Sequence, residues 1–258
     1  MSAKKPALLI KLGGAALQNP ALITSLSRDL SALVGNGIRP VIVHGGGPSI
    51  NEELTARGIS WEFIDGQRVT TPAMIDVIEM VLCGKVNRRI VRELNIAGLP
   101  AVGLSGTDVR MLQCRKASEK LGQVGSVEYV DTRAILAVWE AGLIPVIAPL
   151  GCDAIGSQAF NVNADWAACR IAEALSVERL LFFTDQDGIL GRDGKLIPQI
   201  DRSGLESLIS EQVVRGGMLA KTQTVVHAPN HGIGKVSIMS ASAPHALLKY
   251  ETGTHCYA

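Results

Sequence analysis

Two glycine-rich segments near the start of the chain carry residue types that bind anions. "KLGG" spans residues 11–14, and "HGGG" spans residues 44–47. Glycines between a strand and a helix let main-chain N–H groups approach an anion, and the positive end of the helix dipole adds to the attraction. A lysine at the end of a buried strand is costly unless an anion meets it. Lys11 is therefore a candidate functional residue.

Three kinds of anion fit such loops: a dinucleotide pyrophosphate, a nucleoside triphosphate and a carboxylate. The P-loop pattern G-x-x-x-x-G-K-[ST] occurs nowhere in the chain. The dinucleotide pattern G-x-G-x-x-G fails as well, because "PSINEE" follows Gly47 without a third glycine. A tight strand-to-helix turn remains an alternative for either loop alone. Because neighbouring parallel strands open onto one crevice at their carboxyl ends, we expect both loops and Lys11 to face one ligand site.

The elements that must position these residues follow the rhythm of a mainly parallel sheet. Short apolar runs, such as residues 7–11 and 40–44, alternate with amphipathic helical patterns. Ser49 and Glu52 have the spacing of a capping box, which predicts a helix that starts at the second glycine loop. We also expect a long helix from about residue 72 to 95 and a glycine-hinged hairpin over residues 121–130.

The sequence therefore predicts an α/β fold, a three-layer αβα sandwich with a central, mainly parallel sheet. The strand and helix pattern restarts at residue 177, so residues 1–176 are expected to form an N-terminal lobe and residues 177–258 a C-terminal lobe. No Pro/Ser-rich linker separates them, and we expect the two lobes to share one sheet within a single continuous domain. With 258 residues, of which 47% are hydrophobic, the chain can bury a large core.

Composition excludes several classes of partner. Lys and Arg number 25 against 24 Asp and Glu, so no overall field attracts nucleic acid or acidic membranes. The first apolar run is interrupted by Lys11 and is too short for a signal peptide or a membrane span. The five cysteines show no C-x-x-C spacing, and the five histidines form no metal motif. We therefore expect a cytoplasmic protein without a protein-held metal ion.

Eight motifs occur in a fixed order along almost the whole chain: "IKLGG", "HGGGPSIN", "GQRVT", "GLSGTD", "LGQVGSVEYV", "NVNAD", "TDQDGIL" and "GGMLAK". Together they resemble the acetylglutamate kinases of the amino acid kinase family. The resemblance implies the amino acid kinase fold and phosphoryl transfer from ATP to the side-chain carboxylate of N-acetyl-L-glutamate, the second step of arginine biosynthesis. Catalysis would consist of positioning and charge stabilisation, without a covalent enzyme intermediate.

The resemblance also implies catalytic roles for three residues. Lys11 and Lys221 would flank the migrating phosphoryl group and neutralise the charge that develops on its oxygens. Asp165 would be an ionised carboxylate that tethers and orients the two lysines. Simpler interpretations exist, because Asp165 could cap the helix that follows it and a helical lysine such as Lys221 is usually solvated.

The substrate and nucleotide sites are implied in the same way. Arg68, assisted by Asn161, would hold the α-carboxylate of the substrate. Gly46 and Gly47, with Gly45 as a rival, would bind the reacting carboxylate, and Gly13 and Gly14 would contact phosphate. The nucleotide would lie against the C-terminal lobe, at Asp185, Gln186, Asp187, Gly188, Ile189, Leu190, Val213, Val214 and Arg215. Magnesium would be held mainly by the phosphates of ATP and by water. Neither the residue pattern nor the resemblance assigns a role to His44.

Two other functions remain open. A kinase for N-acetyl-aminoadipate differs by one methylene in its substrate, a difference worth only about 1 to 3 kcal/mol. The same fold also serves as a non-catalytic arginine or amino-acid sensor, although the presence of Lys11, Asp165 and Lys221 favours working chemistry. Arginine-inhibited members of this family resemble hexamers that interlace through an extra N-terminal helix, whereas here only six residues precede the first predicted strand. The resemblance therefore implies a homodimer without arginine feedback.

Overall fold

Eight strands form one central sheet in this computed structural model, which describes residues 6–19, 21–227, 233, 235–243, 245–248 and 252–257. They are β1 (Ala7–Leu12), β2 (Arg39–His44), β5 (Ala101–Ser105), β8 (Ile144–Ala148), β11 (Arg179–Thr184), β12 (Gln199–Asp201), β13 (Lys235–Ser240) and β14 (Thr254–Tyr257). Their order is β12-β14-β13-β11-β1-β2-β8-β5, and all neighbours run parallel except β13 and β14. Because β11 pairs with β1, the sheet is continuous across residues 176 and 177.

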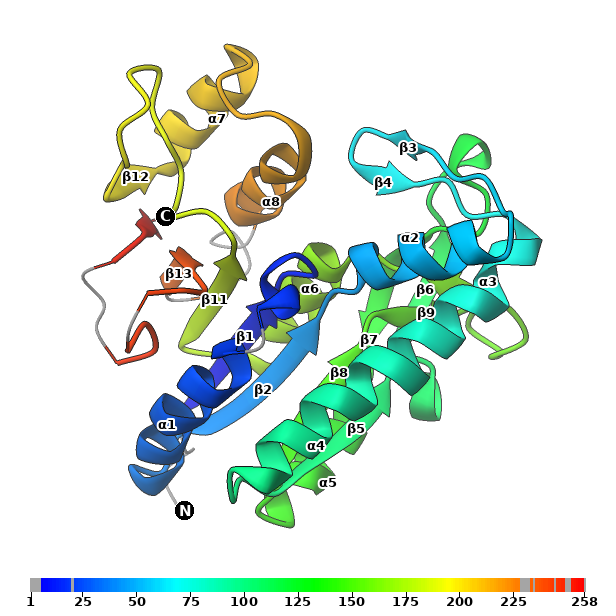
Figure 1. Cartoon of the computed structure of the whole chain (residues 1–258), viewed down its shortest axis with the longest axis horizontal. Coiled ribbons are helices and arrows are strands. Elements are labelled where there is room, and N and C mark those ends of the chain that lie inside the picture. Colours follow the sequence, from blue (N-terminus) through cyan, green and yellow to red (C-terminus); the bar gives the residue numbers. More distant parts are fainter. Residues whose placement is uncertain are drawn as a thin grey trace.

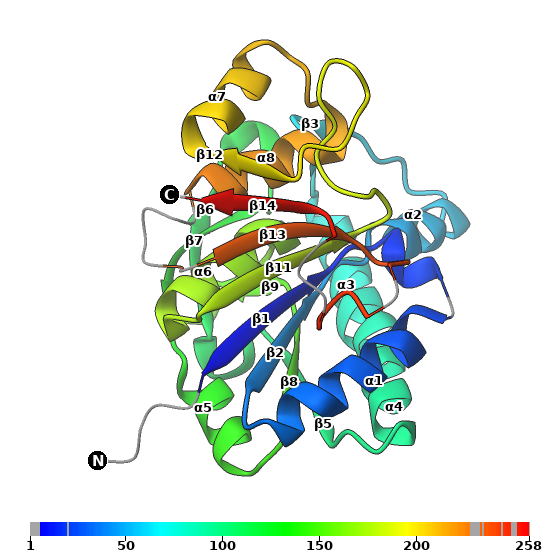
Figure 2. The same ribbon diagram turned by 90° about the vertical axis from the view of Figure 1, so that its left-hand side faces the viewer.

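Helices cover both faces of the sheet, and the predicted three-layer αβα sandwich is confirmed. Figures 1 and 2 show α1 (Ala21–Gly35) and α4 (Arg88–Ile96) on one side of the sheet, and α5 (Arg133–Glu140) and α6 (Ala164–Leu175) on the other. Along β1, Leu8, Ile10 and Leu12 join the core under α1, whereas Ala7 and Leu9 join the core under α6. This alternation is why β1, buried on both faces, reads as a continuous apolar run.

The chain between residues 72 and 96 is helical throughout, close to the prediction, but its geometry changes in the middle. It consists of α3 (Pro72–Glu79), a wider π-helical segment (Met80–Asn87) and α4. The helix after the second glycine loop, α2 (Gly47–Ala56), begins at Gly47 without a side-chain cap, so the predicted capping box is wrong. Pro48 explains the earlier start, because proline favours the first helical turn and has no N–H to satisfy there.

A second sheet and a short hairpin stand above the carboxyl ends of β2 and β8. The second sheet has the order β10 (Ala159–Asn161), β9 (Leu150–Cys152), β6 (Leu112–Lys116), β7 (Gly125–Val130), and the hairpin joins β3 (Phe63–Ile64) to β4 (Gln67–Arg68). The predicted hairpin over residues 121–130 is wrong in its first half, because β7 pairs with β6. Gly122 instead lets two segments touch, since a Cβ there would stand 2.3 Å from the Thr70 carbonyl oxygen.

The C-terminal part of the chain adds two helices, α7 (Arg202–Ser210) and α8 (Gly216–His227). Figure 1 shows them next to each other, α7 near β12 and α8 near the end of β11. Short 3-10 turns occupy Ala16–Gln18, Asp108–Arg110 and Glu119–Leu121. Among the helices in the described ranges, none has the length and apolar character needed to cross a membrane.

Candidate active site

A cavity of about 500 Å³ lies at the carboxyl ends of β1, β2 and β11. The first two strands end directly before the glycine loops, and this edge of a parallel sheet is where ligands commonly bind. The structure thus brings both loops and Lys11 to one cavity, as their places at neighbouring strand ends led us to expect. The remaining predicted catalytic and substrate-binding residues also line it: Arg68, Asn161, Asp165 and Lys221.

Asp165 lies between the two predicted catalytic lysines. Its Oδ1 is 2.8 Å from Lys11 Nζ and 3.2 Å from Lys221 Nζ, and its Oδ2 is 3.4 Å from Lys221 Nζ. All three residues are buried, with exposed fractions of 5% for Lys11, 7% for Asp165 and 6% for Lys221. They come from β1, α6 and α8, so a single carboxylate ties together the central sheet, a helix from residues 1–176 and a helix from residues 177–258.

Asp165 stands in the first turn of α6, but the residue that caps this helix is Asn163. Asn163 Oδ1 accepts hydrogen bonds from the backbone N–H groups of Asp165, at 2.8 Å, and Trp166, at 3.3 Å. The alternative interpretation of Asp165 as the helix cap is therefore wrong. Its carboxylate turns toward the lysines, and the positive end of the helix dipole favours its negative charge.

Burial and charge act in opposite directions on this cluster. Burial alone would raise the pKa of Asp165, but the charges and hydrogen bonds of Lys11 and Lys221 lower this pKa to about 2. Burial lowers the pKa of Lys11 to about 8, because Asp165 offsets only part of the desolvation cost and Lys221 adds repulsion. Asp165 is therefore ionised at neutral pH. With both lysines protonated, the three groups carry one net positive charge, which suits an incoming anion.

The two glycine loops approach each other so closely that a side chain would not fit between them. A Cβ on Gly14 would stand 2.9 Å from Pro48 Cδ and 3.0 Å from Gly47 N, and a Cβ on Gly45 would stand 3.0 Å from Gly14 N. The backbone N–H groups of Gly14, Gly46 and Gly47 therefore gather beside the first turn of α2, whose N-cap is Gly46. Those of Gly13 and Gly45 instead donate to the carbonyl oxygens of Phe183, at 2.9 Å, and Leu12, at 2.8 Å. Such a cluster of N–H groups at a helix start can hold an anion.

Arg68 is 5% exposed and presents its guanidinium at the cavity wall. The guanidinium lies 4.7 Å from the ring centre of Phe63, and its Nη2 donates to Asn51 Oδ1 and, at 3.5 Å, to the Gly47 carbonyl. Its Nη1 is buried and has no hydrogen-bond partner among the described residues. Burial lowers the pKa of Arg68 to about 10, so the group remains charged at neutral pH. A carboxylate ligand would satisfy the unpaired nitrogen.

Asn161 is connected to Arg68 through Thr70. Asn161 Nδ2 donates to Thr70 Oγ1 at 3.0 Å, and Thr70 Oγ1 donates to the Arg68 carbonyl at 3.1 Å. Thr70 is completely buried, and this short chain of bonds fixes the end of β4 against β10. The two residues that resemblance assigns to one carboxylate are thus held at a fixed relative position.

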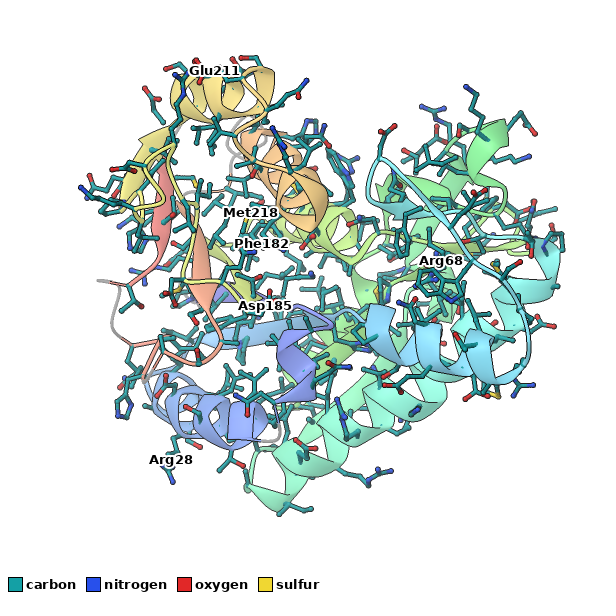
Figure 3. All side chains as sticks on the ribbon, turned by 45° about the horizontal axis from the view of Figure 1, so that its top comes forward. Arg28, Arg68, Phe182, Asp185, Glu211 and Met218 are labelled. Carbon is teal, nitrogen blue, oxygen red and sulfur yellow. The ribbon has the colours of Figure 1, made fainter. Side chains whose placement is uncertain are left out.

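The predicted nucleotide-binding residues divide into three groups. Asp185, Gln186 and Arg215 line the cavity, whereas Ile189 and Val214 are buried in the hydrophobic core shared with α6. In Figure 3, Asp185 and Met218 lie on elements from the C-terminal half of the chain, across from Arg68. The others lie outside the lining of this cavity: Asp187, Gly188, Leu190 and Val213.

Sequence reasoning missed four residues that shape the site, namely Asn51, Phe63, Thr70 and Asn163. A signal existed for Asn51, since it stands one helical turn after Gly47 and therefore on the same face of α2. The roles of Phe63 and Thr70 depend on contacts with Arg68 and Asn161 that no local pattern announces. In the part of the chain that the structure describes, no group of three or more His, Cys, Asp or Glu side chains is arranged to hold a metal ion.

Comparisons with known proteins agree with this geometry. Residues 6–240 match the description "Amino acid kinase family". The chain is 41% identical over 254 residues to an acetylglutamate kinase of Acidiphilium cryptum, covering 93% of this chain and 85% of the relative. It is 45% identical over 245 residues to an acetylglutamate kinase of Thermosynechococcus vestitus, covering 93% and 82%. The crystal structure of smu.665 from Streptococcus mutans has a TM-score of 0.86 and 27% identity, covering 98% of each chain.

Proposed function

The chain belongs to the amino acid kinase family, and from this premise we propose that it phosphorylates the side-chain carboxylate of N-acetyl-L-glutamate. The products are N-acetyl-L-glutamyl 5-phosphate and ADP, and the reaction is the second step of arginine biosynthesis. The observation that carries the proposal is the Lys11–Asp165–Lys221 cluster beside two converging glycine loops. This arrangement supplies positive charge and N–H donors where two anions must meet, which is the main requirement of phosphoryl transfer.

In the proposed reaction, an oxygen of the substrate carboxylate attacks the γ-phosphorus, and the bond between this phosphorus and the bridging oxygen of ADP breaks. Lys11 and Lys221 stabilise the negative charge on the oxygens of the transferred group. Asp165 holds the two ammonium groups within 3.2 Å of one carboxylate oxygen, so they converge on the same region without leaving one lysine unpaired. No proton needs to be removed, because the attacking carboxylate is already ionised.

The acceptor is proposed to lie against the N-terminal lobe, residues 1–176. Its α-carboxylate meets Arg68, whose buried Nη1 otherwise has no partner among the described residues, and Asn161 assists. Its reacting carboxylate meets the N–H groups of Gly46 and Gly47, at the start of α2. Arg68 donates a hydrogen bond to Asn51, which also lies on α2. One helix would therefore fix the distance between the groups that bind the two carboxylates of the substrate.

The phosphoryl donor is proposed to be ATP with Mg²⁺, bound against the C-terminal lobe, residues 177–258. Asp185, Gln186 and Arg215 line the cavity on this side, and the N–H group of Gly14 is proposed to meet the phosphates. Gly13 contributes through its lack of a side chain, because its own N–H donates to the Phe183 carbonyl at 2.9 Å. The further nucleotide contacts are proposed at Asp187, Gly188, Leu190 and Val213. Ile189 and Val214 are buried in the core and would support this surface without touching the nucleotide. Mg²⁺ arrives as part of the substrate and keeps phosphate and water oxygens as its ligands.

We also propose that the enzyme is a cytoplasmic homodimer. All five cysteines are free thiols, as expected in a reducing compartment. Large apolar side chains are exposed on the N-terminal lobe, including Met80 at 48%, Ile96 at 86% and Ile155 at 79%, and burying such side chains between two copies of the chain would stabilise a dimer. Size-exclusion chromatography with light scattering should give twice the chain mass of 27.3 kDa, whereas a monomer would contradict the dimer.

The function is tested by coupled measurement of ADP release with ATP, Mg²⁺ and N-acetyl-L-glutamate. Glutamate and aspartate serve as controls, and N-acetyl-aminoadipate tests the alternative acceptor. We expect release that depends on N-acetyl-L-glutamate and is at least about tenfold less efficient with the longer substrate, since one methylene is worth about 1 to 3 kcal/mol. Equal or better turnover of N-acetyl-aminoadipate would reassign the substrate, and no turnover of either would reject the kinase function.

A further inference from the structure

His44 is the last residue of β2 and directly precedes the three glycines of the second loop. Its exposed fraction is 0%, so no atom of His44 is accessible to a substrate in the cavity. Its Nδ1 lies 3.0 Å from the carbonyl oxygen of Gly45, and its Nε2 lies 3.2 Å from Asn87 Nδ2. Both ring nitrogens are therefore engaged, one by the loop and one by the helical layer.

Asn87 decides which nitrogen of His44 carries the proton. Asn87 Nδ2 donates to the Val146 carbonyl at 2.9 Å, and the reverse amide orientation would set two oxygens against each other. The same NH₂ group points a donor at His44 Nε2, which must therefore be an unprotonated acceptor. The amide fits only because the facing strand has Gly103, where a Cβ would stand 1.9 Å from Asn87 Oδ1.

The proton of the neutral ring then resides on Nδ1, which donates to the Gly45 carbonyl. Burial, together with the positive charges of Arg89 on α4 and Lys11 on β1, lowers the pKa of His44 to about 4, although the Gly45 carbonyl acts in the opposite direction. The imidazole is thus neutral at physiological pH. It is a fixed donor, not a proton shuttle.

The hydrogen bond from His44 to the Gly45 carbonyl also fixes the direction of the Gly46 N–H group. The Gly45–Gly46 peptide is trans, as are all peptide bonds in the described ranges, so its N–H points opposite to its C=O. The C=O faces His44, and the N–H of Gly46 therefore faces away from the core. Gly46 N stands 3.2 Å from the place where a Cβ on Gly14 would be, which is on the cavity side where the two glycine loops meet.

We propose that His44, locked by Asn87 as the Nδ1–H tautomer, is a positioning residue that aims the Gly46 N–H group at the reacting carboxylate. The proposal rests on the proposed kinase function for its catalytic consequence, while the lock itself is a property of the free protein. It assigns a task to the one bulky residue of the "HGGG" segment.

The π-helical segment explains how one stretch of chain supports the loop at two points. Leu82 packs on Gly46, where a Cβ would stand 2.6 Å from Leu82 Cδ2, and Asn87 bonds to His44. Residues five apart point in different directions on an α-helix, at 100° per residue, but the i→i+5 bonding of a π-helix brings them toward one face. The segment Met80–Asn87 therefore presents both side chains to the same glycine loop.

Two substitutions of matched polarity separate positioning from packing. In His44→Asn the amide nitrogen takes the place of Nδ1 and can still donate to Gly45, whereas in His44→Gln it takes the place of Nε2 and cannot. Since one preorganised donor is worth about 10²- to 10³-fold in kcat, we expect His44→Gln to lower kcat at least about 10²-fold with little change in KM for ATP. His44→Asn should stay within about tenfold of the unsubstituted enzyme.

A packing role predicts the opposite order, because glutamine fills more of the imidazole volume than asparagine. Equal kcat values in the two variants, or higher activity in His44→Gln, would overturn the positioning role. Thermal unfolding of both variants gives the packing contribution separately, and His44→Asn, which loses its bond to Asn87, should be no more stable than His44→Gln.

The lock is tested without catalysis by ¹⁵N NMR of the histidine ring. We expect His44 to show a protonated Nδ1 and an unprotonated Nε2, with no titration between pH 8 and about pH 5. In Asn87→Leu, which removes the amide donor, the unprotonated Nε2 loses its hydrogen bond, and its ¹⁵N shift should move toward that of an imidazole nitrogen without a donor. A protonated Nε2 in the unsubstituted protein would overturn the lock, whereas the expected tautomer in a protein that fails to phosphorylate N-acetyl-L-glutamate would reject only the proposed function.

Discussion

Replacing Asp165 by asparagine should convert Lys11 from a cation into a neutral amine at neutral pH. Lys11 is fully buried, and burial has already lowered its pKa to about 8 in the presence of the Asp165 carboxylate. Asparagine is nearly isosteric but removes the negative charge that opposes this desolvation, while the repulsion from Lys221 remains. The pKa of Lys11 must therefore fall further.

The size of the effect follows from the distance between the two groups. At an effective dielectric constant of about 20, opposite charges 2.8 Å apart attract by about 6 kcal/mol. Even half of this, about 3 kcal/mol, corresponds to about two pKa units. The pKa of Lys11 would then move from about 8 to about 6. At pH 8 about half of the unsubstituted enzyme, but only about 1% of the variant, would carry the proton.

The assay is kcat/KM for ADP release across pH 5.5 to 9.5, which reports ionisations of the free enzyme. Activity requires the protonated lysine, so it should fall as pH rises through about 8 in the unsubstituted enzyme and through about 6 in Asp165→Asn. This fall in activity is the alkaline limb of the pH profile. Asp165→Glu keeps the negative charge and should leave the alkaline limb near its original pH. Lys11→Arg, which stays protonated throughout this range, should remove the limb while lowering kcat.

An alkaline limb that stays at the same pH in Asp165→Asn would refute the electrostatic reasoning. A limb that persists in Lys11→Arg would show that another group is responsible for it. Removing Asp165 also leaves two buried lysines without their counter-ion, so unfolding by urea should show a loss of about 3 to 5 kcal/mol. Asp165→Glu, which retains the counter-ion, provides the folded control for this comparison.

Three further changes test other parts of the site. Arg68→Lys should raise KM for N-acetyl-L-glutamate at least about tenfold and leave KM for ATP unchanged, because lysine cannot make a two-pronged contact with a carboxylate; an equal rise in both constants would contradict this role. Gly14→Ala should lower kcat about 10²-fold, because its Cβ would meet Pro48 Cδ at 2.9 Å and push the loops apart; unchanged kinetics would show that the loops do not form the anion site. Finally, the pKa of His44 falls from 6.5 to about 4 on folding. Between these pH values the unfolded chain binds a proton that the folded chain does not. The free energy of unfolding should therefore drop by about 3 kcal/mol as pH falls from 6.5 to 4. Urea unfolding should show this loss, and its persistence in His44→Asn would assign it to other groups.

Much of the scaffold could be predicted because its signals are local. Strands buried on both faces appear as short apolar runs, and glycines at their ends mark the turns toward the site. Lys11 stood out because a charged residue at the end of such a run needs a partner. Helix starts were less predictable, since Ser49 and Glu52 have capping-box spacing but the helix begins earlier, at Gly47.

The contacts that complete the site join residues far apart in the chain, and no local sequence pattern predicts these contacts. Asp165 and Lys221 are separated by 56 positions, and His44 and Asn87 by 43. The first pair could be anticipated only from the resemblance of whole motifs to a family. The second could not, because Asn87 lies in a π-helical segment whose residue directions differ from those of the α-helix that the pattern predicts.

The pKa of Lys11 also indicates why this site binds anions with glycine N–H groups and not with further lysines. Lys221 already lowers the pKa of Lys11 by repulsion, and one carboxylate must balance both. A third buried cation would lower the pKa of Lys11 further and lose the proton on which its charge stabilisation depends. Backbone N–H groups stabilise anions without carrying net charge, so they add to the site without weakening the lysines. A donor of this kind has no side chain to orient it, and a neutral, buried His44 meets that need without introducing another charge.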